Sequence, residues 1–290
     1  MKRIPFTKMQ GIGNDYLYVD CTKTDHFEGR GAEEFAKRFS DRHFGIGSDG
    51  VIVIRPSEKA DFRMEMLNAD GSQGRMCGNG IRCLTRYVIE RGLTPKKEVE
   101  VETLSGIRVI STGVDEFGKF YASVNMGKPS FRTKDIPVNR ASGVMINEAI
   151  NAAGSLYNVT AVSMGNPHAV IFTKDVDRLD ISGIGPEFEK HRLFPEGVNT
   201  EFAEILDRQK IRMRVWERGS GETMACGTGA CATVAAAVTI GLSARKVEVV
   251  LNGGSLNIYW DPDTEEITMV GPAEFVFDGE VEFDPVELAK

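Results

Sequence analysis

Two short cysteine turns have the residue types and spacing that could carry chemistry. Cys77–Gly80 reads Cys-Gly-Asn-Gly and Cys226–Gly229 reads Cys-Gly-Thr-Gly, each directly before a segment with the composition of a helix. The first N–H groups of a helix lack internal partners and carry partial positive charge, so a carboxylate can bind there, and the glycines leave the backbone accessible. The same field favours thiolate and lowers a cysteine pKa from about 8.5 toward neutrality. Each turn therefore predicts an anion site beside a reactive sulfur.

Two such turns facing each other could move a proton across one carbon atom. A carboxylate held between two helix N-termini would have a sulfur on either face of its α-carbon. One cysteine, as thiolate, would remove the proton, and the other, as thiol, would return one to the opposite face. The helix N–H groups would take up the charge that develops on the carboxylate, and one such donor lowers a barrier by about 2.7–4 kcal/mol in enzymes where it has been measured. The pattern predicts racemisation or epimerisation of a small molecule with no cofactor and no metal.

The two turns belong to a diverged duplication of the chain. Cys77 and Gly92 recur as Cys226 and Gly241, at one offset of 149 positions (77 to 226, 92 to 241). Two further pairs keep the same order: residues 13–16 (Gly-Asn-Asp-Tyr) with 165–168 (Gly-Asn-Pro-His), and residues 47–54 with 197–204. We therefore expect two domains of one fold, residues 1–127 with a C-terminal tail 276–290, and residues 128–275.

The hydrophobic periodicity within each half is mostly that of strands. Apolar and polar residues alternate in the strands expected at 62–66, 99–102, 211–215, 247–250, 256–259 and 267–270, and in a hairpin over 107–126. Helices are expected only at 33–42, 78–91 and 228–240, the last apolar on every side and therefore buried all round. Gly92 and Gly241 stand where left-handed helix caps are expected. The predicted class is α+β, with each half a curved, mostly antiparallel sheet around one central helix.

Composition excludes several classes of function. The 290 residues carry 35 basic and 42 acidic side chains, for a net charge of −7 and a pI near 5.3, so a nucleic-acid partner is not expected. There is no apolar run of about 18 residues and no signal peptide at the N-terminus, so no membrane association is expected either. Five cysteines, an odd number, indicate free thiols in a reducing compartment, which predicts a cytoplasmic protein.

Six short motifs in one order, spread over nearly the whole chain, resemble the diaminopimelate epimerase family. They are residues 8–16 (KMQGIGNDY), 68–72 (NADGS) through 76–82 (MCGNGIR), 165–168 (GNPH), and 216–219 (WERG) through 225–229 (ACGTG). The resemblance implies interconversion of LL- and meso-2,6-diaminopimelate without a cofactor, in lysine biosynthesis, by a homodimer. It implies that Cys77 takes the proton from the LL isomer and Cys226 takes it from the meso isomer.

The resemblance also assigns the remaining site residues. His168 and Glu217 would tune the thiols, and a carboxylate or imidazole beside a thiol can do so. Arg218 can bind a carboxylate through two hydrogen bonds. The full set of binding residues implied is Asn14, Asn68, Gly78, Asn79, Asn166, Asn199, Glu217, Arg218, Gly227 and Thr228. Some family members carry glutamine at the position of Gly50, and any contact made by that side chain is absent here.

Other interpretations remain open at this point. A related proline or hydroxyproline racemase would show His after the first Cys-Gly, where this chain has Asn79. A thiol redox sensor would pair Cys77 with Cys226 when oxidised. Zinc-ligand spacing is absent, and residues 45–50 match a dinucleotide-binding fingerprint in the wrong structural order. Arg82 and Arg86 are interpreted as a solvated helix face, and the remaining cysteines, Cys21, Cys83 and Cys231, as buried apolar residues.

Overall fold

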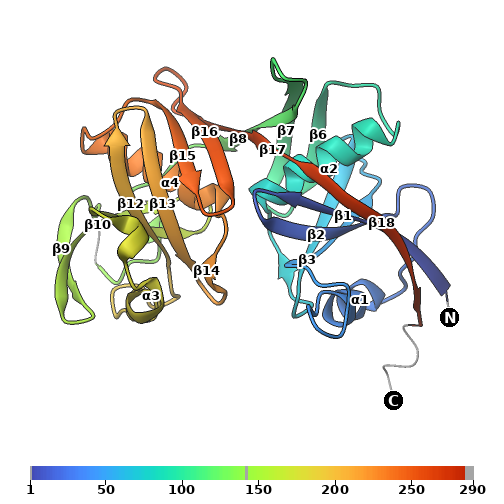
Figure 1. The fold of residues 1–290 in the computed structure, drawn as a ribbon, viewed down its shortest axis with the longest axis horizontal. Coiled ribbons are helices and arrows are strands. Elements are labelled where there is room, and N and C mark those ends of the chain that lie inside the picture. The colour runs from blue at the N-terminus through green and yellow to red at the C-terminus, as the bar shows by residue number, and fades with distance from the viewer. Residues whose placement is uncertain (1, 141–142, 285–290) are drawn as a thin grey trace. The chain divides into compact units, whose positions relative to one another are not determined.

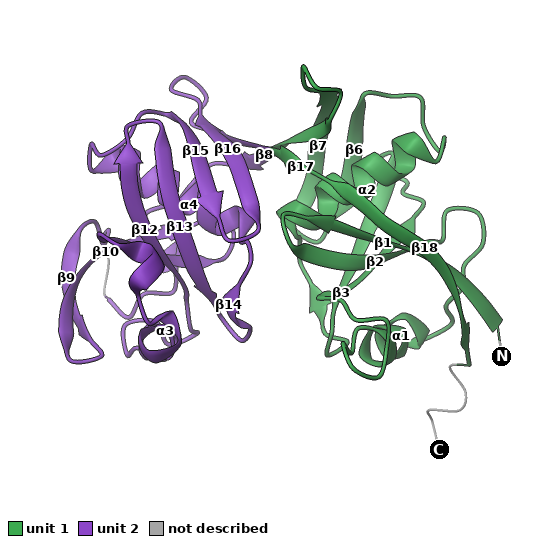
Figure 2. Cartoon of the chain, viewed as in Figure 1, with its two compact units in different colours: residues 1–124, 271–290 green, residues 125–270 purple. Residues whose placement is uncertain are grey.

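The chain folds into two compact units. The computed structural model describes residues 2–140 and 143–284, so residues 285–290 of the expected C-terminal tail lie outside the described residues. Unit 1 comprises residues 1–124 and 271–290, and unit 2 comprises residues 125–270 (Figure 2). Both chain termini belong to unit 1 (Figure 1).

Unit 1 is built mainly from strands. They are β1 (Lys2–Gly11), β2 (Asn14–Asp20), β3 (Gly50–Arg55), β4 (Phe62–Asn68), β5 (Gln73–Gly74), β6 (Glu98–Thr103), β7 (Gly106–Val114), β8 (Phe120–Gly127) and β18 (Glu274–Phe283). The chain leaves unit 1 along β8. β1 lies between β2 and β18, antiparallel to both. β2 pairs with β3 in parallel, β3 with β4 antiparallel, β4 with β6 in parallel, and β6, β7 and β8 form an antiparallel meander.

Unit 2 repeats this order of pairings. Its strands are β9 (Glu148–Ala152), β10 (Ser155–Ser163), β11 (Pro167–Phe172), β12 (Asn199–Asp207), β13 (Lys210–Glu217), β14 (Gly221–Thr223), β15 (Lys246–Leu251), β16 (Gly254–Trp260) and β17 (Ile267–Pro272). β10 lies between β9 and β11, antiparallel to both, β11 pairs with β12 in parallel, and β13 pairs with β15 in parallel. The remaining pairs, β12 with β13, β15 with β16 and β16 with β17, are antiparallel. The α+β class is confirmed, with mixed sheets that have two parallel pairs in each unit.

Each unit has one central helix, as the sequence predicts. α2 (Gly78–Glu90) contacts β1, β2, β3 and β7, and α4 (Gly227–Thr239) contacts the corresponding β10, β11, β12 and β16. α4 is almost entirely buried, because its alanines, Val234 and Cys231 present small apolar surfaces in every direction. Gly92 and Gly241 follow the two helices with φ of 68° and 79°, the left-handed conformation that ends helices at low cost in glycine.

An outer helix covers each sheet, and the sequence predicts only one of the two. α1 (Gly31–Phe39) packs Phe35 and Phe39 against Phe27 and Phe283 in the core of unit 1. α3 (Ile181–Glu189) packs Phe188 into the core of unit 2. We did not expect α3, because its two glycines and internal proline disfavour a helix. Asp180 stabilises its start by accepting a hydrogen bond from Gly183 N at 3.1 Å. Two short 3-10 helices, η1 (Thr133–Asp135) and η2 (Val176–Arg178), complete unit 2.

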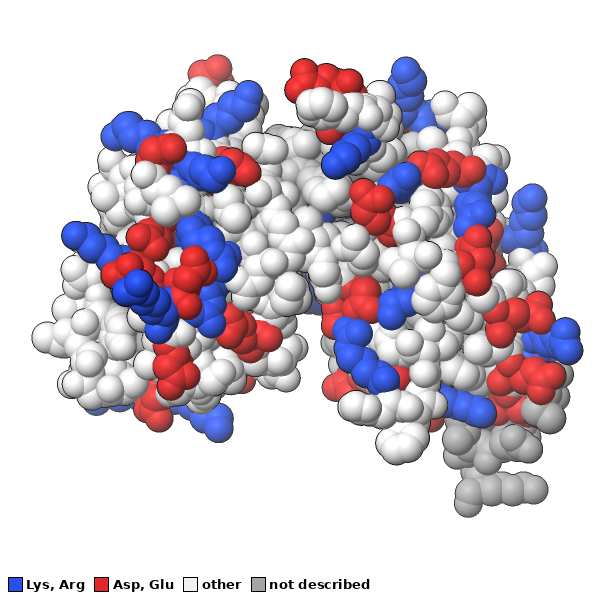
Figure 3. Space-filling model, viewed as in Figure 1, with Lys and Arg blue, Asp and Glu red and all other residues white. Residues whose placement is uncertain are grey.

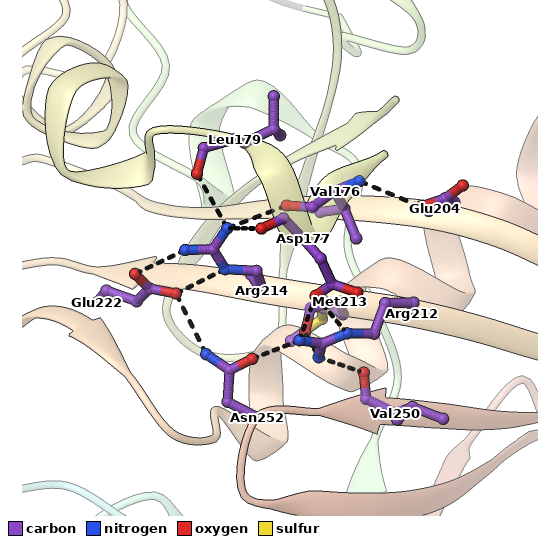
Figure 4. A network of polar contacts seen from close by, with 10 residues as sticks. All are labelled: Val176, Asp177, Leu179, Glu204, Arg212, Met213, Arg214, Glu222, Val250 and Asn252. Atoms are coloured by element: carbon purple, nitrogen blue, oxygen red, sulfur yellow. Dashed lines mark hydrogen bonds and ion pairs between the residues drawn. The ribbon is translucent and has the colours of Figure 1, made fainter. Parts of the chain in front are cut away.

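Two arginines on β13 tie neighbouring segments of unit 2 together (Figure 4). Arg214 donates to both carboxylate oxygens of Glu222 on β14, and to the carbonyl oxygens of Val176 and Leu179 around η2. Arg212 donates to Asp177 and to Asn252. Because these contacts fix the course of β13 and β14, they also fix the end of β13, where Glu217 lies.

The charged surface of each unit mixes both signs. On the face shown in Figure 3, lysine and arginine side chains alternate with aspartate and glutamate on each unit. Many of these side chains form ion pairs, such as Lys210 with Glu248 at 3.0 Å. Within the described part of the chain, no helix is both long and apolar enough to cross a bilayer.

Candidate active site

Cys77 caps the central helix of unit 1 with its own sulfur. The residue has extended backbone angles, φ −125° and ψ 118°, and its Sγ accepts a hydrogen bond from Gly80 N at 3.3 Å. The first backbone bond of the helix runs from Ile81 N to Cys77 O at 2.9 Å. The N–H groups of Gly78 and Asn79 lie in this first turn, where a helix offers no backbone acceptors. Since Cys77 is half-buried, a partly accessible sulfur lies beside these groups.

Asn14 links Cys77 to a carboxylate. Cys77 Sγ donates to Asn14 Oδ1 at 3.1 Å, and Asn14 Nδ2 donates to Asp49 Oδ2 at 2.7 Å. Asp49 Oδ2 also accepts from Asp15 N at 3.0 Å. The sequence places Asn14 in the site but gives no role to Asp49, which lies in the turn before β3.

Lysine and arginine side chains surround this carboxylate. Asp15 pairs with Lys8 at 2.9 Å and with Arg42 at 2.7 Å, and Arg42 also reaches Asp49 at 2.9 Å. Burial favours a protonated Asp15, but its bonds to Arg42 and Lys8 outweigh burial and lower its pKa. Burial and the charge of Asp15 raise the pKa of Asp49. The cluster therefore holds two carboxylates whose pKa values are shifted in opposite directions, close to Asn14.

Two buried tyrosines pack against the start of α2. Burial, followed by the charges of Cys77 and Asp49, raises the pKa of Tyr16 well above its ordinary value. Tyr18 donates its hydroxyl to Gly80 O at 2.9 Å. Both side chains come from β2, so this strand supplies Asn14, Tyr16 and Tyr18 to one turn of helix.

Arg82 is buried, which corrects the sequence interpretation of a solvated pair of arginines. Its side chain has no exposed surface, and it donates to Gly78 O at 3.2 Å, to Asn79 Oδ1 at 2.9 Å and to Pro272 O at 3.1 Å. Arg86 is also largely covered, between Glu90 and Glu274. Sequence spacing put both residues on one helix face but gave no sign that β18 and the segment before it cover that face. Arg82 therefore fixes the Asn79 side chain beneath the first turn.

Unit 2 repeats the cysteine cap. Cys226 has φ −123° and ψ 109°, and its Sγ accepts from Gly229 N at 3.4 Å. Its carbonyl oxygen accepts from Ala230 N at 3.0 Å. Gly227 and Thr228 occupy the positions of Gly78 and Asn79, and the Thr228 hydroxyl lies 3.5 Å from Cys226 Sγ. Unlike Cys77, Cys226 is buried, with 5% of its surface exposed.

A chain of polar groups leads from Cys226 to a buried histidine–glutamate pair. Asn166 Nδ2 donates to Thr228 Oγ1 at 3.2 Å, and Asn166 Oδ1 lies 2.9 Å from His168 Nε2. His168 Nδ1 lies 2.7 Å from Glu201 Oε1, and neither side chain of this pair has any exposed surface. The structure therefore joins three residues expected from the sequence, Asn166, His168 and Thr228, and adds Glu201.

The electrostatics around Cys226 oppose ionisation, contrary to the sequence expectation of a lowered cysteine pKa. Burial, followed by the carboxylates of Glu217 and Glu201, raises the Cys226 pKa well above its ordinary value, and these effects outweigh the helix N-terminus. Burial also raises the pKa of Glu217, whose Oε1 accepts a short hydrogen bond from the Thr223 hydroxyl. Cys226 is therefore held as a thiol in this arrangement.

Asn199 and Arg218 lie together in unit 2. Asn199 is buried, donates to Pro167 O at 3.0 Å and accepts from Arg218 N at 2.9 Å. The Arg218 guanidinium donates to Glu196 O at 2.8 Å and lines an open pocket of about 530 Å³. In unit 1, Asn68 donates to Ser72 Oγ at 2.9 Å and pairs with Gly50 in the sheet, so it lies one strand away from Tyr16.

The duplication places different side chains at equivalent positions. In the parallel pairs, Tyr16 faces Gly50 in unit 1 as His168 faces Asn199 in unit 2. A Cβ atom on Gly80 would lie 2.6 Å from Ile52 Cδ1, and one on Gly229 would lie 2.5 Å from Glu201 Oε1. Glu201 therefore takes the place of Ile52. Sequence reasoning missed Glu201. The offset of 149 positions that relates Gly50 to Asn199 also relates Ile52 to Glu201, so extending the duplication along this strand would have found it.

The other three cysteines are buried. They are Cys21, Cys83 and Cys231, and their burial is what their interpretation as buried residues expects. Burial raises the pKa of both Cys21 and Cys83 to about 11. Within residues 2–140 and 143–284, no three His, Cys, Asp or Glu side chains come close enough to hold a metal ion.

Comparison with known proteins identifies the family. The sequence model described as diaminopimelate epimerase matches residues 6–132 and 160–276. A protein named diaminopimelate epimerase from Acetivibrio thermocellus is 50% identical over 279 residues, covering 96% of this chain and 99% of that protein. One of the same name from Desulfovibrio desulfuricans is 51% identical over 282 residues, covering 95% and 97%.

Solved structures share the fold at lower identity. A Bacillus anthracis phenazine biosynthesis protein of the PhzF family matches with a TM-score of 0.72 and 21% identity, over 98% of this chain and 100% of that one. A hydroxyproline epimerase from Agrobacterium vitis, solved with bound trans-4-hydroxy-L-proline, matches with a TM-score of 0.68 and 14% identity, over 99% and 94%. These likenesses show the two-unit fold, and the full-length sequence relatives show that this chain belongs to the diaminopimelate epimerase family and is an amino-acid epimerase.

Proposed function

We propose that this chain interconverts LL- and meso-2,6-diaminopimelate, a step of lysine biosynthesis, with Cys77 and Cys226 as the proton-exchanging pair and no cofactor. The observation that carries the proposal is the repeated cap. Each unit presents one cysteine sulfur at the N-terminus of its central helix, bonded to the third residue after it at 3.3 Å or 3.4 Å. The names of the full-length relatives support the choice of substrate.

The surroundings of the two sulfur atoms differ. Cys226 is buried near two carboxylates, so we propose that it begins as a thiol and donates the proton in the LL-to-meso direction. Cys77 is partly accessible and lies on a helix start without a buried carboxylate at the place of Glu201, so we propose that it acts as the base in that direction. The roles exchange in the reverse direction.

The remaining residues would bind the substrate. The first-turn N–H groups at Gly78, Asn79, Gly227 and Thr228 can receive the carboxylate at the reacting carbon. Arg218 can bind the distal carboxylate, while Glu217 or the amide oxygens of Asn14, Asn68, Asn166 and Asn199 accept from ammonium groups. His168 and Glu217 would tune the pKa of Cys226. Glu217 acts on the sulfur by its charge, and His168 is linked to it through Asn166 and Thr228.

Activity of cysteine variants tests this function. Cys77→Ala and Cys226→Ala should each abolish epimerisation of LL-diaminopimelate, while Cys231→Ala, which lies one helical turn beyond Cys226, should retain it. L-Proline and trans-4-hydroxy-L-proline, assayed beside diaminopimelate, separate this function from that of a proline-type racemase. Full activity in either of the first two variants contradicts the proposal, as does turnover of the proline substrates alone.

Assembly and location complete the proposal. Family resemblance suggests a homodimer in the cytoplasm. Sedimentation equilibrium tests the first part, with a mass near twice 31.9 kDa expected and a monomer contradicting it. Fractionation of the source cells tests the second.

A further inference from the structure

The orientation of the Asn14 side chain follows from its carboxylate neighbour. An ionised aspartate can only accept hydrogen bonds, so the amide group that faces Asp49 Oδ2 at 2.7 Å must be the NH₂. The amide oxygen then has to face Cys77, and it lies 3.1 Å from Sγ. An oxygen acceptor can bond to a thiol S–H but offers nothing to a thiolate. Asp49 therefore selects, through Asn14, the protonated form of Cys77.

Asp49 is fixed more firmly than an ordinary loop residue. Its carboxylate binds Arg42 at 2.9 Å and Asp15 N at 3.0 Å, and its own N–H donates to Asp15 O at 2.8 Å. Arg42 also binds the Asp15 carboxylate. These contacts keep the carboxylate from turning away, so the Asn14 amide cannot exchange its two ends without losing a charged partner.

The other groups around Cys77 within unit 1 differ in their effect on its ionisation. Gly80 N–H points at the sulfur and favours the thiolate. Tyr16 on β2 contacts Cys77, and Tyr18 and Cys83 lie nearby. The pKa values of Tyr16, Tyr18 and Cys83 are all raised, so these three side chains are neutral at physiological pH. Buried Arg82 on α2 favours a negative charge, while Asp15 and Lys8 largely cancel each other. Asp49 is thus the charged group that is linked to Cys77 by one intervening side chain, that of Asn14.

We propose that Asp49 is a positioning residue for Cys77: acting through Asn14, it holds the Cys77 side chain as a thiol while no substrate is bound. This inference rests on the proposed function, in which Cys77 must ionise to remove the α-proton and Asn14 binds the substrate. A substrate that engages the Asn14 amide removes the acceptor from the sulfur, so the half-buried Cys77 releases its proton to solvent water after the substrate has bound. In unit 2 the equivalent Asn166 turns its NH₂ toward the Thr228 hydroxyl instead, so this device belongs to the Cys77 half alone.

Iodoacetamide labelling of Cys77 without substrate tests the proposal, because only the thiolate reacts. Labelling of the Cys77 peptide is followed by mass spectrometry from pH 6 to 10 in the full-length protein. Asp49→Asn keeps the size of the side chain but lets the Asn14 NH₂ turn to the sulfur. We expect the labelling profile to move about one pH unit lower, which is about tenfold faster labelling at a fixed pH below the midpoint.

Two further variants separate positioning from charge and from misfolding. Asp15→Asn removes one negative charge from the same cluster without touching the Asn14 side chain, and its Cys77 profile should stay near that of the parent protein. Asn14→Ala removes the acceptor itself and should speed labelling. Adding Asp49→Asn to it should then give no further gain, because an effect transmitted through Asn14 cannot add once Asn14 is gone. Far-ultraviolet circular dichroism checks that each variant is folded.

Three results would overturn the proposal: an unchanged Cys77 profile in folded Asp49→Asn, an equal shift in Asp15→Asn, or full additivity in the double variant. Labelling needs no substrate, so these outcomes do not depend on whether diaminopimelate is turned over. If diaminopimelate is a substrate, Asp49→Asn should also move the acidic limb of the kcat/KM profile to lower pH, since that limb reports the base in the free enzyme.

Discussion

Replacing His168 with leucine should destabilise unit 2 far more than an average substitution. The change leaves Glu201 fully buried with its only described hydrogen-bond partner gone, because Oε1 bonds to His168 and Oε2 has no partner among the described residues. Removing one member of a buried pair costs about 3–5 kcal/mol of unfolding free energy, since the other polar group stays in the interior without its partner.

Tryptophan fluorescence during urea unfolding measures this effect selectively. Both tryptophans of the chain, Trp216 and Trp260, lie in unit 2, so the signal reports that unit. With a slope of about 2 kcal/mol per molar urea, a loss of about 4 kcal/mol lowers the midpoint by about 2 M.

A double variant supplies the matched control. In unit 1 the position of Glu201 is held by Ile52, so His168→Leu with Glu201→Ile gives unit 2 an apolar pair of the kind the fold already accepts. Replacing a buried ion pair by apolar residues is often neutral or stabilising, so the double variant should recover most of the lost stability. A loss under about 1 kcal/mol in His168→Leu, or a double variant less stable than the single one, would refute this description of the pair.

Three further outcomes are expected in unit 1. Gly50→Ala should cost about 3 kcal/mol or more in chemical unfolding followed by circular dichroism, because the added Cβ would lie 2.1 Å from Leu67 O; a stable variant would contradict this packing. Tyr18→Phe should cost about 1 kcal/mol by losing the 2.9 Å bond to Gly80 O, and no loss would mean that the bond contributes nothing. The Cys83 pKa is raised from 9.0 to about 11, so the unfolded state loses its proton first and stability should fall as pH rises from about 9 to about 11; Cys83→Ala should flatten that fall.

The sequence predicts the elements whose signals are local. The hairpin over residues 107–126 turns at Gly118, with φ of 76°, as its Asp-Glu-Phe-Gly turn implies. The two central helices begin one residue from the cysteines because the glycine turns and the apolar periodicity agree there. The helix α3 escaped prediction because Asp180 and the Phe188 contacts stabilise a segment whose own residues disfavour a helix.

For the candidate site, the family motifs supplied residues that contact the cysteines, such as Asn14 beside Cys77 and Thr228 beside Cys226. They did not supply the residues behind them. Asp49 and Glu201 act across strand pairs that are far apart in sequence, and Arg82 bonds to Pro272 at the end of β17, 190 positions later in the chain. The raised Cys226 pKa follows from burial and from the carboxylates of Glu217 and Glu201, of which the motifs supplied Glu217 alone.

The measurement that tests the central claim most directly is early deuterium uptake in heavy water. Two thiols working on opposite faces should deliver solvent deuterium to the α-carbon of newly formed meso-diaminopimelate, while the remaining LL substrate stays unlabelled at low conversion. The LL and meso isomers are separated within the first few per cent of reaction, and mass spectrometry then measures the deuterium content of each. Product that keeps the original α-proton, or substrate labelled as fast as product, would mean that a single group both takes and returns the proton, and the two-cysteine account would be wrong.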